Sequence, residues 1–320
     1  MGKDRYYRIM DKKATRDSYG EALVMLAEKR PDLIVLDADL AAATKTGIYK
    51  KAYPDRFFDC GIAEADMMGV AAGIATTGKL VFASSFAMFA AGRAFEIVRN
   101  SICYPHLNVK IGATHAGISV GEDGASHQCN EDIALMRVLP GMTVINPADD
   151  VETKAAVLAM ADYVGPTYMR FGRLAIPTFN DPKTYKFELG KGIELRSGND
   201  IAIIATGLMV NEAIEAGKIL AEQGINARVI NIHTIKPIDR DIIIRAAKET
   251  GKIITVEEHS VIGGLGSAVS EVVTETVSVP VIKIGVQDKF GHSGPAVPLL
   301  KEFGLCADNI VKVTKEALGK

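Results

Sequence analysis

Runs of apolar, β-branched residues alternate with longer segments of helical period along most of this chain. Parallel strands need long crossover connections, which are usually helices, so the alternation predicts an α/β fold: a mostly parallel sheet with helices on both faces. Helical segments are expected over 18–28, 65–77 and 149–163. The strand-like runs of the first half are 33–36, 80–83, 109–113, 142–145 and 167–171.

A second alternating block follows an irregular stretch rich in Pro, Asn, Asp, Gly and Lys. Helices are expected there over 211–223 and 239–250, and strands over 201–205, 227–232, 253–257 and 281–284. The chain is long enough for two α/β domains with full cores. We expect domains at 1–180 and 199–320, joined by a linker at 181–198.

Composition narrows the classes of function. A net charge of -2 and the absence of a long basic run argue against nucleic-acid binding. The segment 1–13 lacks the apolar core of a signal peptide, and no run of about 18 apolar residues is present to span a membrane. The cysteines are far apart and lack metal-ligand spacing, so we expect free thiols, no zinc site and a cytoplasmic protein. They are Cys60, Cys103, Cys129 and Cys306.

Polar residues follow several of the strand-like runs. Asp37 and Asp39 come after the first run, Glu64 follows another apolar segment, and His115 follows 109–113. Ligands of parallel sheets collect at the carboxyl ends of the strands, so one edge is expected to gather two acids, a glutamate and a histidine. Glu64 also opens a very apolar helix. Partial desolvation would suit its carboxylate to proton sharing, whereas a plain helix-capping role is the commoner arrangement on spacing alone.

Phe86 and Phe89 are three residues apart at the start of an expected helix that continues through small residues. Both rings can then share one helix face. Such a pair is usually part of a core, and the alternative is a platform for a flat heteroaromatic ring.

The segment 114–128 holds two histidines and two acids among three glycines. A glycine-rich loop makes tight turns, and its His115, Asp123 and His127 can hydrogen-bond several hydroxyls at once. A plain solvated loop is one alternative. Metal ligation by the two histidines is another, but a spacing of twelve residues is unspecific, and we predict no metal site in this chain.

Two further segments suggest anion binding. Arg170 and Arg173 end the last strand of the first domain, where a guanidinium can grip a phosphate or form a surface ion pair. In the second domain, 256–259 leads to a glycine turn and a helix start at 263–267. Helix N-termini can bind anions, although close helix packing or a subunit contact explains these glycines equally well.

In order and spacing, four segments together resemble the C-terminal half of transketolases: 37–40, 60–64, 86–92 and 115–128. The later segments 235–239 and 256–259 resemble the family's C-terminal domain. The resemblance covers nearly the whole chain from about Thr15. It implies a thiamine-diphosphate-enzyme pyrimidine domain followed by a C-terminal domain whose role is mainly structural.

The resemblance also implies roles for single residues. Glu64 would hydrogen-bond the pyrimidine ring of thiamine diphosphate and promote loss of the thiazolium proton. Phe86 and Phe89 would pack against that ring, and Asp39 would lie near the cofactor at a subunit contact. The reaction implied is transfer of a two-carbon ketol unit from a ketose phosphate to an aldose phosphate, in the non-oxidative pentose phosphate pathway.

The substrate positions are implied in the same way. Asp123 and His127 would bind sugar hydroxyls, His115 and Arg173 would meet the terminal phosphate, and both histidines would take part in catalysis. Some positions depart from the family pattern. Ala43 stands where many relatives have a phosphate-binding serine, and Ala63 and Ala65 replace Arg and His beside the catalytic glutamate.

A magnesium-bound diphosphate needs a Gly-Asp-Gly motif followed by Asn, and no Gly-Asp-Gly occurs here. We therefore expect an N-terminal partner subunit that holds the diphosphate and Mg²⁺, in an α2β2 assembly. Two alternatives stay open. One is the β subunit of a 2-oxo acid dehydrogenase or a deoxyxylulose-phosphate synthase-like enzyme, and the other is a non-catalytic regulatory subunit.

Overall fold

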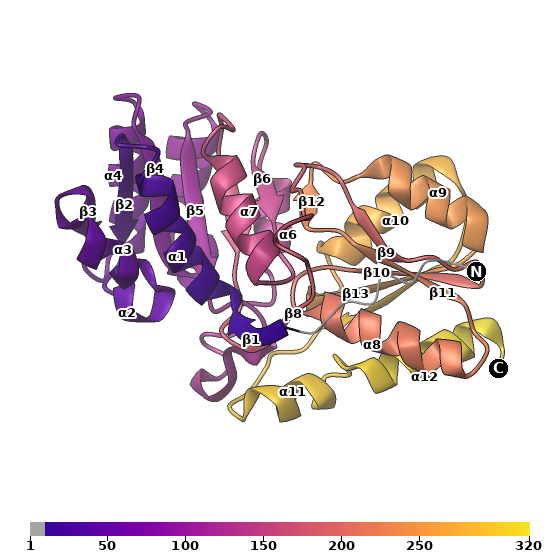
Figure 1. The fold of residues 1–320 in the computed structure, drawn as a ribbon. Coiled ribbons are helices and arrows are strands. Elements are labelled where there is room, and N and C mark those ends of the chain that lie inside the picture. Colours follow the sequence, from indigo (N-terminus) through magenta and orange to yellow (C-terminus); the bar gives the residue numbers. More distant parts are fainter. Residues whose placement is uncertain (1–9) are drawn as a thin grey trace.

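The computed structural model describes residues 10–320 and divides them between two large sheets, which lie side by side in Figure 1. Residues 1–9, part of the segment considered above for a signal peptide, lie outside the described residues. The larger sheet has the strand order β12-β6-β7-β5-β4-β2-β3, and the smaller has the order β14-β13-β10-β11-β9. A short antiparallel ribbon pairs β1 with β8.

The strands of the first 180 residues are β1 (Met10–Ala14), β2 (Leu33–Asp37), β3 (Phe57–Asp59), β4 (Leu80–Phe86), β5 (Val109–Thr114), β6 (Thr143–Ile145), β7 (Thr167–Arg170) and β8 (Ala175–Thr178). The later strands are β9 (Ile193–Arg196), β10 (Ile201–Ala205), β11 (Ala227–Asn231), β12 (Thr234–Lys236), β13 (Ile253–Ser260) and β14 (Val281–Val286). Within each large sheet all pairs are parallel except those made by β12 and β9. The expected two-domain α/β architecture is confirmed.

Helices cover both faces of the larger sheet because its central strands are apolar on both sides. Along β4, Val81 and Ala83 join one core cluster while Leu80 and Phe82 join the other, as the two-residue period of a strand requires. One face is covered by α1 (Thr15–Ala27), α3 (Thr46–Ala52) and α7 (Asp150–Met160). The opposite face is covered by α4 (Glu64–Ala75), α6 (Asp132–Val138) and the π-helical turns η2 (Met88–Arg93) and η3 (Val98–Cys103).

The smaller sheet is covered in the same way (Figure 1). The helices α9 (Arg240–Thr250) and α10 (Leu265–Thr276) lie on one face, and α8 (Met209–Glu222), α11 (Ala296–Glu302) and α12 (Ala307–Leu318) on the other. The short elements are α2 (Ala41–Thr44), η1 (Pro54–Arg56), α5 (Phe95–Ile97) and η4 (Ile118–Asp123). Within residues 10–320, no helix combines the length and apolarity needed to cross a membrane.

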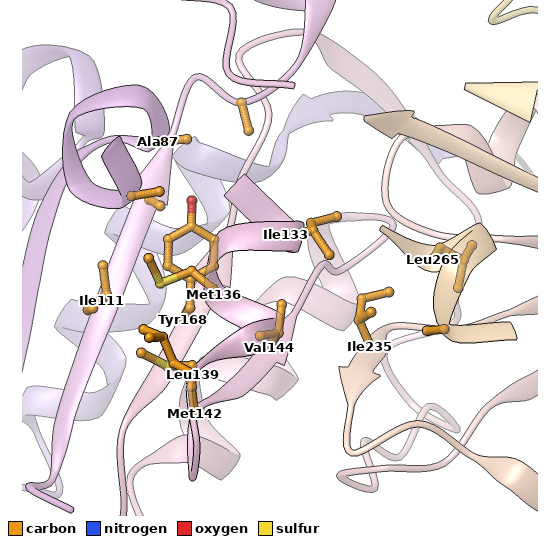
Figure 2. Packing of buried hydrophobic residues seen from close by; sticks show 14 of the residues in the cluster. Ala87, Ile111, Ile133, Met136, Leu139, Met142, Val144, Tyr168, Ile235 and Leu265 are labelled. Atoms are coloured by element: carbon orange, nitrogen blue, oxygen red, sulfur yellow. The ribbon is translucent and has the colours of Figure 1, made fainter. Parts of the chain in front are cut away.

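The two domains share one apolar core. Figure 2 shows Ile133 and Val144 of the first domain on the side that faces Ile235 and Leu265 of the second, and all four are buried. The strand β12, although it lies in the range 199–320, hydrogen-bonds to β6 and so extends the first sheet. The expected linker 181–198 is also not wholly irregular, because it contains β9.

Buried carboxylates at the start of α7 fasten the chain between the domains. Glu152 accepts hydrogen bonds from the Ala148 amide at 2.7 Å, the Tyr185 hydroxyl at 2.6 Å and Asn231 Nδ2 at 2.8 Å. Asp149 accepts from the amides of residues 179 and 180 at 3.0 and 2.8 Å. Burial raises the pKa of both carboxyls, and every group facing Glu152 in these bonds is a donor. One side chain thus joins α7, the connecting segment and β11.

Replacing Glu152 with alanine should therefore lower the free energy of unfolding by about 3 kcal/mol or more, because three donors lose their shared acceptor. Urea denaturation followed by far-UV circular dichroism measures the change. Tyr185→Phe should cost about 1–2 kcal/mol, since one donor is lost and two remain. The surface variant Glu316→Ala is the control and should stay within about 0.5 kcal/mol. Equal stability of Glu152→Ala and the control would contradict this account.

Candidate functional site

Four aromatic rings meet where β4 and β5 end. Phe86 is the last residue of β4 and lies opposite Thr114 in the sheet, so the next residue, His115, reaches its ring. The rings of Phe86 and His115 stack with centroids 3.8 Å apart, and Phe86 and Phe89 stack at 5.9 Å. His127 meets Phe89 edge-on at 5.3 Å. We call Phe86, Phe89, His115 and His127 the aromatic cluster.

The expectation that Phe86 and Phe89 share a helix face is wrong. Phe86 belongs to the strand, and Phe89 lies in the π-helical turn η2 that follows it. The rings nevertheless lie nearly parallel, with 13° between their planes. A three-residue spacing brings the rings together here because the chain changes from strand to turn between them.

Glu64 is the first residue of α4 and is only 2% exposed. Its Oε2 oxygen is buried and accepts no hydrogen bond from the described residues, so this oxygen does not cap the helix. The nearest cation is Arg93, whose Nη1 lies 3.7 Å from Oε2 and whose guanidinium also lies over the Phe89 ring. Because Arg93 is 61% exposed, water screens this pair. Glu64 thus lies beside the aromatic cluster with unused acceptor capacity.

His115 is buried and held by two hydrogen bonds. Its Nε2 lies 2.8 Å from Arg16 Nη1, and its Nδ1 lies 2.9 Å from the Thr114 hydroxyl. A guanidinium can only donate, so Nε2 is the acceptor and Nδ1 carries the proton that the hydroxyl accepts. Burial, with the nearby charges of Arg16 and Arg173, lowers the pKa of His115 to about 3. The imidazole is therefore neutral at physiological pH.

Arg16 is a site residue that the sequence analysis missed. It lies in the first turn of α1, and its Nη1 also lies 3.2 Å from the carbonyl oxygen of Ala43. A cation is unfavourable near a helix N-terminus, so an arginine at this position indicates a role other than stabilising the helix. This was the signal by which the sequence could have identified Arg16. Arg173 and Lys45 also lower the pKa of His115 through their charges, so this neutral ring lies in the field of three cations. We call Arg16, Lys45 and Arg173 the cationic rim.

Residues 115–128 are not a plain solvated loop. Most of the segment 115–121 is buried, whereas Asp123 is exposed and His127 is half-buried. Arg173 donates to the main-chain oxygen of Val120 and lies 3.1 Å from Glu122. His115 and His127 thus lie near the two ends of this segment, and Arg173 contacts its middle. Asp123 lies in the exposed part.

A cleft of about 660 Å³ opens beside the aromatic cluster. Phe89, Arg93 and Ser126 line it from the first domain, and Ser260 and Phe290 line it from the second. Within residues 10–320, no group of three or more His, Cys, Asp or Glu side chains is arranged to hold a metal ion. All four cysteines have free thiols.

The two acids at the end of β2 have different surroundings. Asp37 is buried and accepts hydrogen bonds from the hydroxyls of Thr44 and Thr46 at 2.7 and 2.8 Å, so it anchors the turn around Ala43. Burial raises its pKa to about 6. Asp39 is exposed and has a positive φ of 59°, and its amide donates to Asp59. The expected group of two acids, a glutamate and a histidine is thus only partly formed.

Two suggested anion sites are filled by the protein itself. Arg170 is buried rather than on the surface, and its Nε donates to Asp132 at 2.8 Å. The N-terminus of α10 is occupied by Glu257, which accepts from the amides of Leu265 and Gly266 at 2.6 and 2.8 Å. Arg170 and the N-terminus of α10 are therefore not available to bind a phosphate.

Comparison with known proteins agrees with this geometry. Residues 11–178 match the transketolase pyrimidine-binding domain, and residues 190–310 match the transketolase C-terminal domain. A putative transketolase C-terminal section from Methanocaldococcus jannaschii is 51% identical over 96% of this chain and 97% of its own length. A 6-deoxy-6-sulfo-D-fructose transketolase subunit from Clostridium sp. strain MSTE9 is 43% identical, over 94% and 93%.

Among solved structures, one described as a split-gene transketolase in an inactive β4 tetramer is similar over 96% of this chain and 98% of its own. The two share 54% sequence identity and superpose with a TM-score of 0.89. Two matched domains, close relatives over almost the full chain and a common fold lead to one conclusion: this chain belongs to the transketolase family and carries its pyrimidine-binding and C-terminal domains.

Proposed function

We propose that this chain is the C-terminal subunit of a split transketolase that transfers a two-carbon ketol unit between sugar phosphates. The buried Oε2 of Glu64, without a donor among residues 10–320, carries the proposal. A buried carboxylate oxygen in this state needs a partner, and a protonated ring nitrogen of a ligand can provide one.

The residues present fit thiamine diphosphate. An aminopyrimidine is flat, and the site offers it one carboxylate and the aromatic rings of Phe86 and Phe89. When bound, thiamine diphosphate supplies a nucleophilic carbon that adds to a carbonyl and stores the electrons of the cleaved bond. In this proposal Glu64 holds a proton at the pyrimidine ring, and Phe89, which lines the cleft, packs against that ring. Asp39 is exposed, and in this proposal it lies at the contact with the partner subunit.

The cationic rim is suited to a sugar phosphate. Arg16 and Arg173 offer guanidinium donors for a phosphate, and His115, which contacts Arg16, is neutral and adds no charge. The exposed Asp123 and the half-buried His127 are free to bind sugar hydroxyls and to move protons between them and a carbonyl oxygen. Ala43 contributes its main-chain oxygen, which accepts a hydrogen bond from Arg16 at 3.2 Å.

The diphosphate and Mg²⁺ are assigned to a partner subunit. The sequence contains no Gly-Asp-Gly, and no metal-holding group of side chains occurs among residues 10–320. Relatives are described as a C-terminal section, as a subunit and as an inactive β4 tetramer, which supports a chain that needs a partner. We therefore propose an α2β2 assembly in the cytoplasm. One relative is described as acting on a sulfonated sugar, so relatives differ in the sugar they use. For this chain we propose the sugar phosphates of the pentose phosphate pathway.

The proposed role of Glu64 predicts a large effect of Glu64→Gln in the complex with the N-terminal subunit. Loss of the acid/base group should lower ketol transfer from xylulose 5-phosphate to ribose 5-phosphate by about 10²-fold or more. It should also slow exchange of the thiamine C2 proton by a similar factor. Glu96→Gln, an exposed glutamate on α5, is the control and should retain the wild-type rate. An unchanged rate in Glu64→Gln would favour a non-catalytic role for this chain.

The cationic rim predicts a selective effect of Arg16→Ala. The KM for xylulose 5-phosphate should rise about tenfold or more, because a charged hydrogen bond contributes about 2 kcal/mol. The kcat/KM for unphosphorylated xylulose should change little. Steady-state kinetics of the reconstituted complex measure both, with the exposed Arg99→Ala as control. Equal losses for the two sugars would show that Arg16 does not bind the phosphate.

A further inference from the structure

Two neighbouring glutamates at the end of β13 serve different domains. Alternation along the strand turns their side chains to opposite faces of the sheet. Glu257 accepts hydrogen bonds from the first amides of α10, within its own domain. Glu258 reaches the first domain instead, where its Oε1 accepts from the Ser119 amide at 2.6 Å. Ser119 belongs to the first part of η4, which bends at Gly121 (φ 84°) before it ends at Asp123.

The contact between Glu258 and this turn is closely fitted. A Cβ atom at Gly117 would overlap the Glu258 carboxylate, and Gly117 has a positive φ of 79°. Both observations restrict this position to glycine, so the carboxylate packs directly on the main chain. The turn therefore cannot shift toward β13 and has an anchor that holds it in place.

The contact is also buried, and a buried cation lies beside it. Glu258 is 3% exposed, and Arg170 Nη2 donates to its main-chain oxygen at 2.8 Å. Arg170 also forms an ion pair with the carboxylate of Asp132, which is buried as well. Burial raises the pKa of Glu258, and the charge of Arg170 opposes that effect. An ionised Glu258 is the better acceptor for an amide, and the cation helps to keep it so.

A second contact from the C-terminal domain reaches the same segment. Gln128 Nε2 lies 3.0 Å from the main-chain oxygen of His292 and 3.2 Å from that of Gly121. The residue before Gln128 is His127, a member of the aromatic cluster. The second domain thus contacts the segment 115–128 at Ser119 and at Gln128. Asp123 and His127 lie between these two positions in the sequence.

We propose that Glu258 is a positioning residue: from the C-terminal domain, it fixes the turn at Ser119 and so positions the segment 115–128, which presents Asp123 and His127 to the sugar. The proposal rests on the function proposed above and deepens it, since it gives the C-terminal domain a part in substrate binding. The geometry that carries it is a buried, cross-domain hydrogen bond to the main chain of this turn.

The first test uses the chain as it is and needs no substrate. Hydrogen–deuterium exchange of the amides in 117–121 should be about tenfold faster or more in Glu258→Ala, which removes the acceptor. Glu258→Gln keeps an acceptor oxygen without the charge, so its increase should be smaller. Glu257→Gln is the matched control and should speed exchange at 265–266 but not at 117–121. Equal effects of the two Gln variants on 117–121, or no effect of either, would overturn the proposal.

The second test uses the complex with the N-terminal subunit. Glu258→Gln should raise the KM for xylulose 5-phosphate several-fold and leave exchange of the thiamine C2 proton at the wild-type rate, because Glu64 is untouched. A merely structural defect would lower both. If wild-type complex neither transfers ketol units nor exchanges the C2 proton, the proposed function fails. If wild type is active and Glu258→Gln has the wild-type KM, only the role of Glu258 fails. Should Glu258→Ala not fold, the Gln variant decides.

Discussion

The arrangement of the site depends on a carboxylate oxygen that is shielded from water and given no donor. An unpartnered buried acceptor costs about 1–3 kcal/mol, and Glu64 Oε2 is in this state. The position of Glu64 at the start of α4 offsets part of the cost, because the N-terminus of a helix favours negative charge. The apolar side of α4 packs on the sheet and fixes the helix. The fold thus leaves the Glu64 carboxylate able to accept a hydrogen bond from a ligand.

The second domain does more than stabilise the first. It contributes β12 to the larger sheet and shares the apolar core of Figure 2. It also donates a hydrogen bond to Glu152 through Asn231 and accepts one from Arg170 at the main-chain oxygen of Glu258. Glu258 and the main chain at His292 then reach the segment 115–128. These contacts are buried and specific, so we expect the two domains to move as one body. The site residues on that segment therefore depend on both halves of the chain.

Much of the fold could be predicted from the sequence because its signals are local. The expected strand at 33–36 is β2, which ends one residue later, and the α4 helix begins at Glu64, next to the expected start at 65. The strand expected at 80–83 continues to Phe86, and in this continuation the Ser84 hydroxyl lies 2.6 Å from the Tyr19 hydroxyl. Because the strand continues through Phe86, the expectation that Phe86 begins a helix was wrong.

The parts that could not be predicted are contacts between residues far apart in sequence. Arg170 pairs with Asp132, and Glu258 bonds Ser119 across 139 residues, so neither leaves a local pattern. Arg16 was missed because it meets His115 only in the folded chain. The roles proposed for Asp39, Asp123 and His127 rest on the resemblance to transketolases and not on a local pattern.

The most direct measurement is a structure of this chain in complex with its N-terminal subunit, thiamine diphosphate and Mg²⁺. The account predicts that Glu64 Oε2 lies within hydrogen-bond distance of the pyrimidine ring, about 2.5–3.0 Å, with the diphosphate and the metal held by the other chain. A Glu64 carboxyl turned to bulk water, or a cofactor bound away from Phe86 and Phe89, would contradict it.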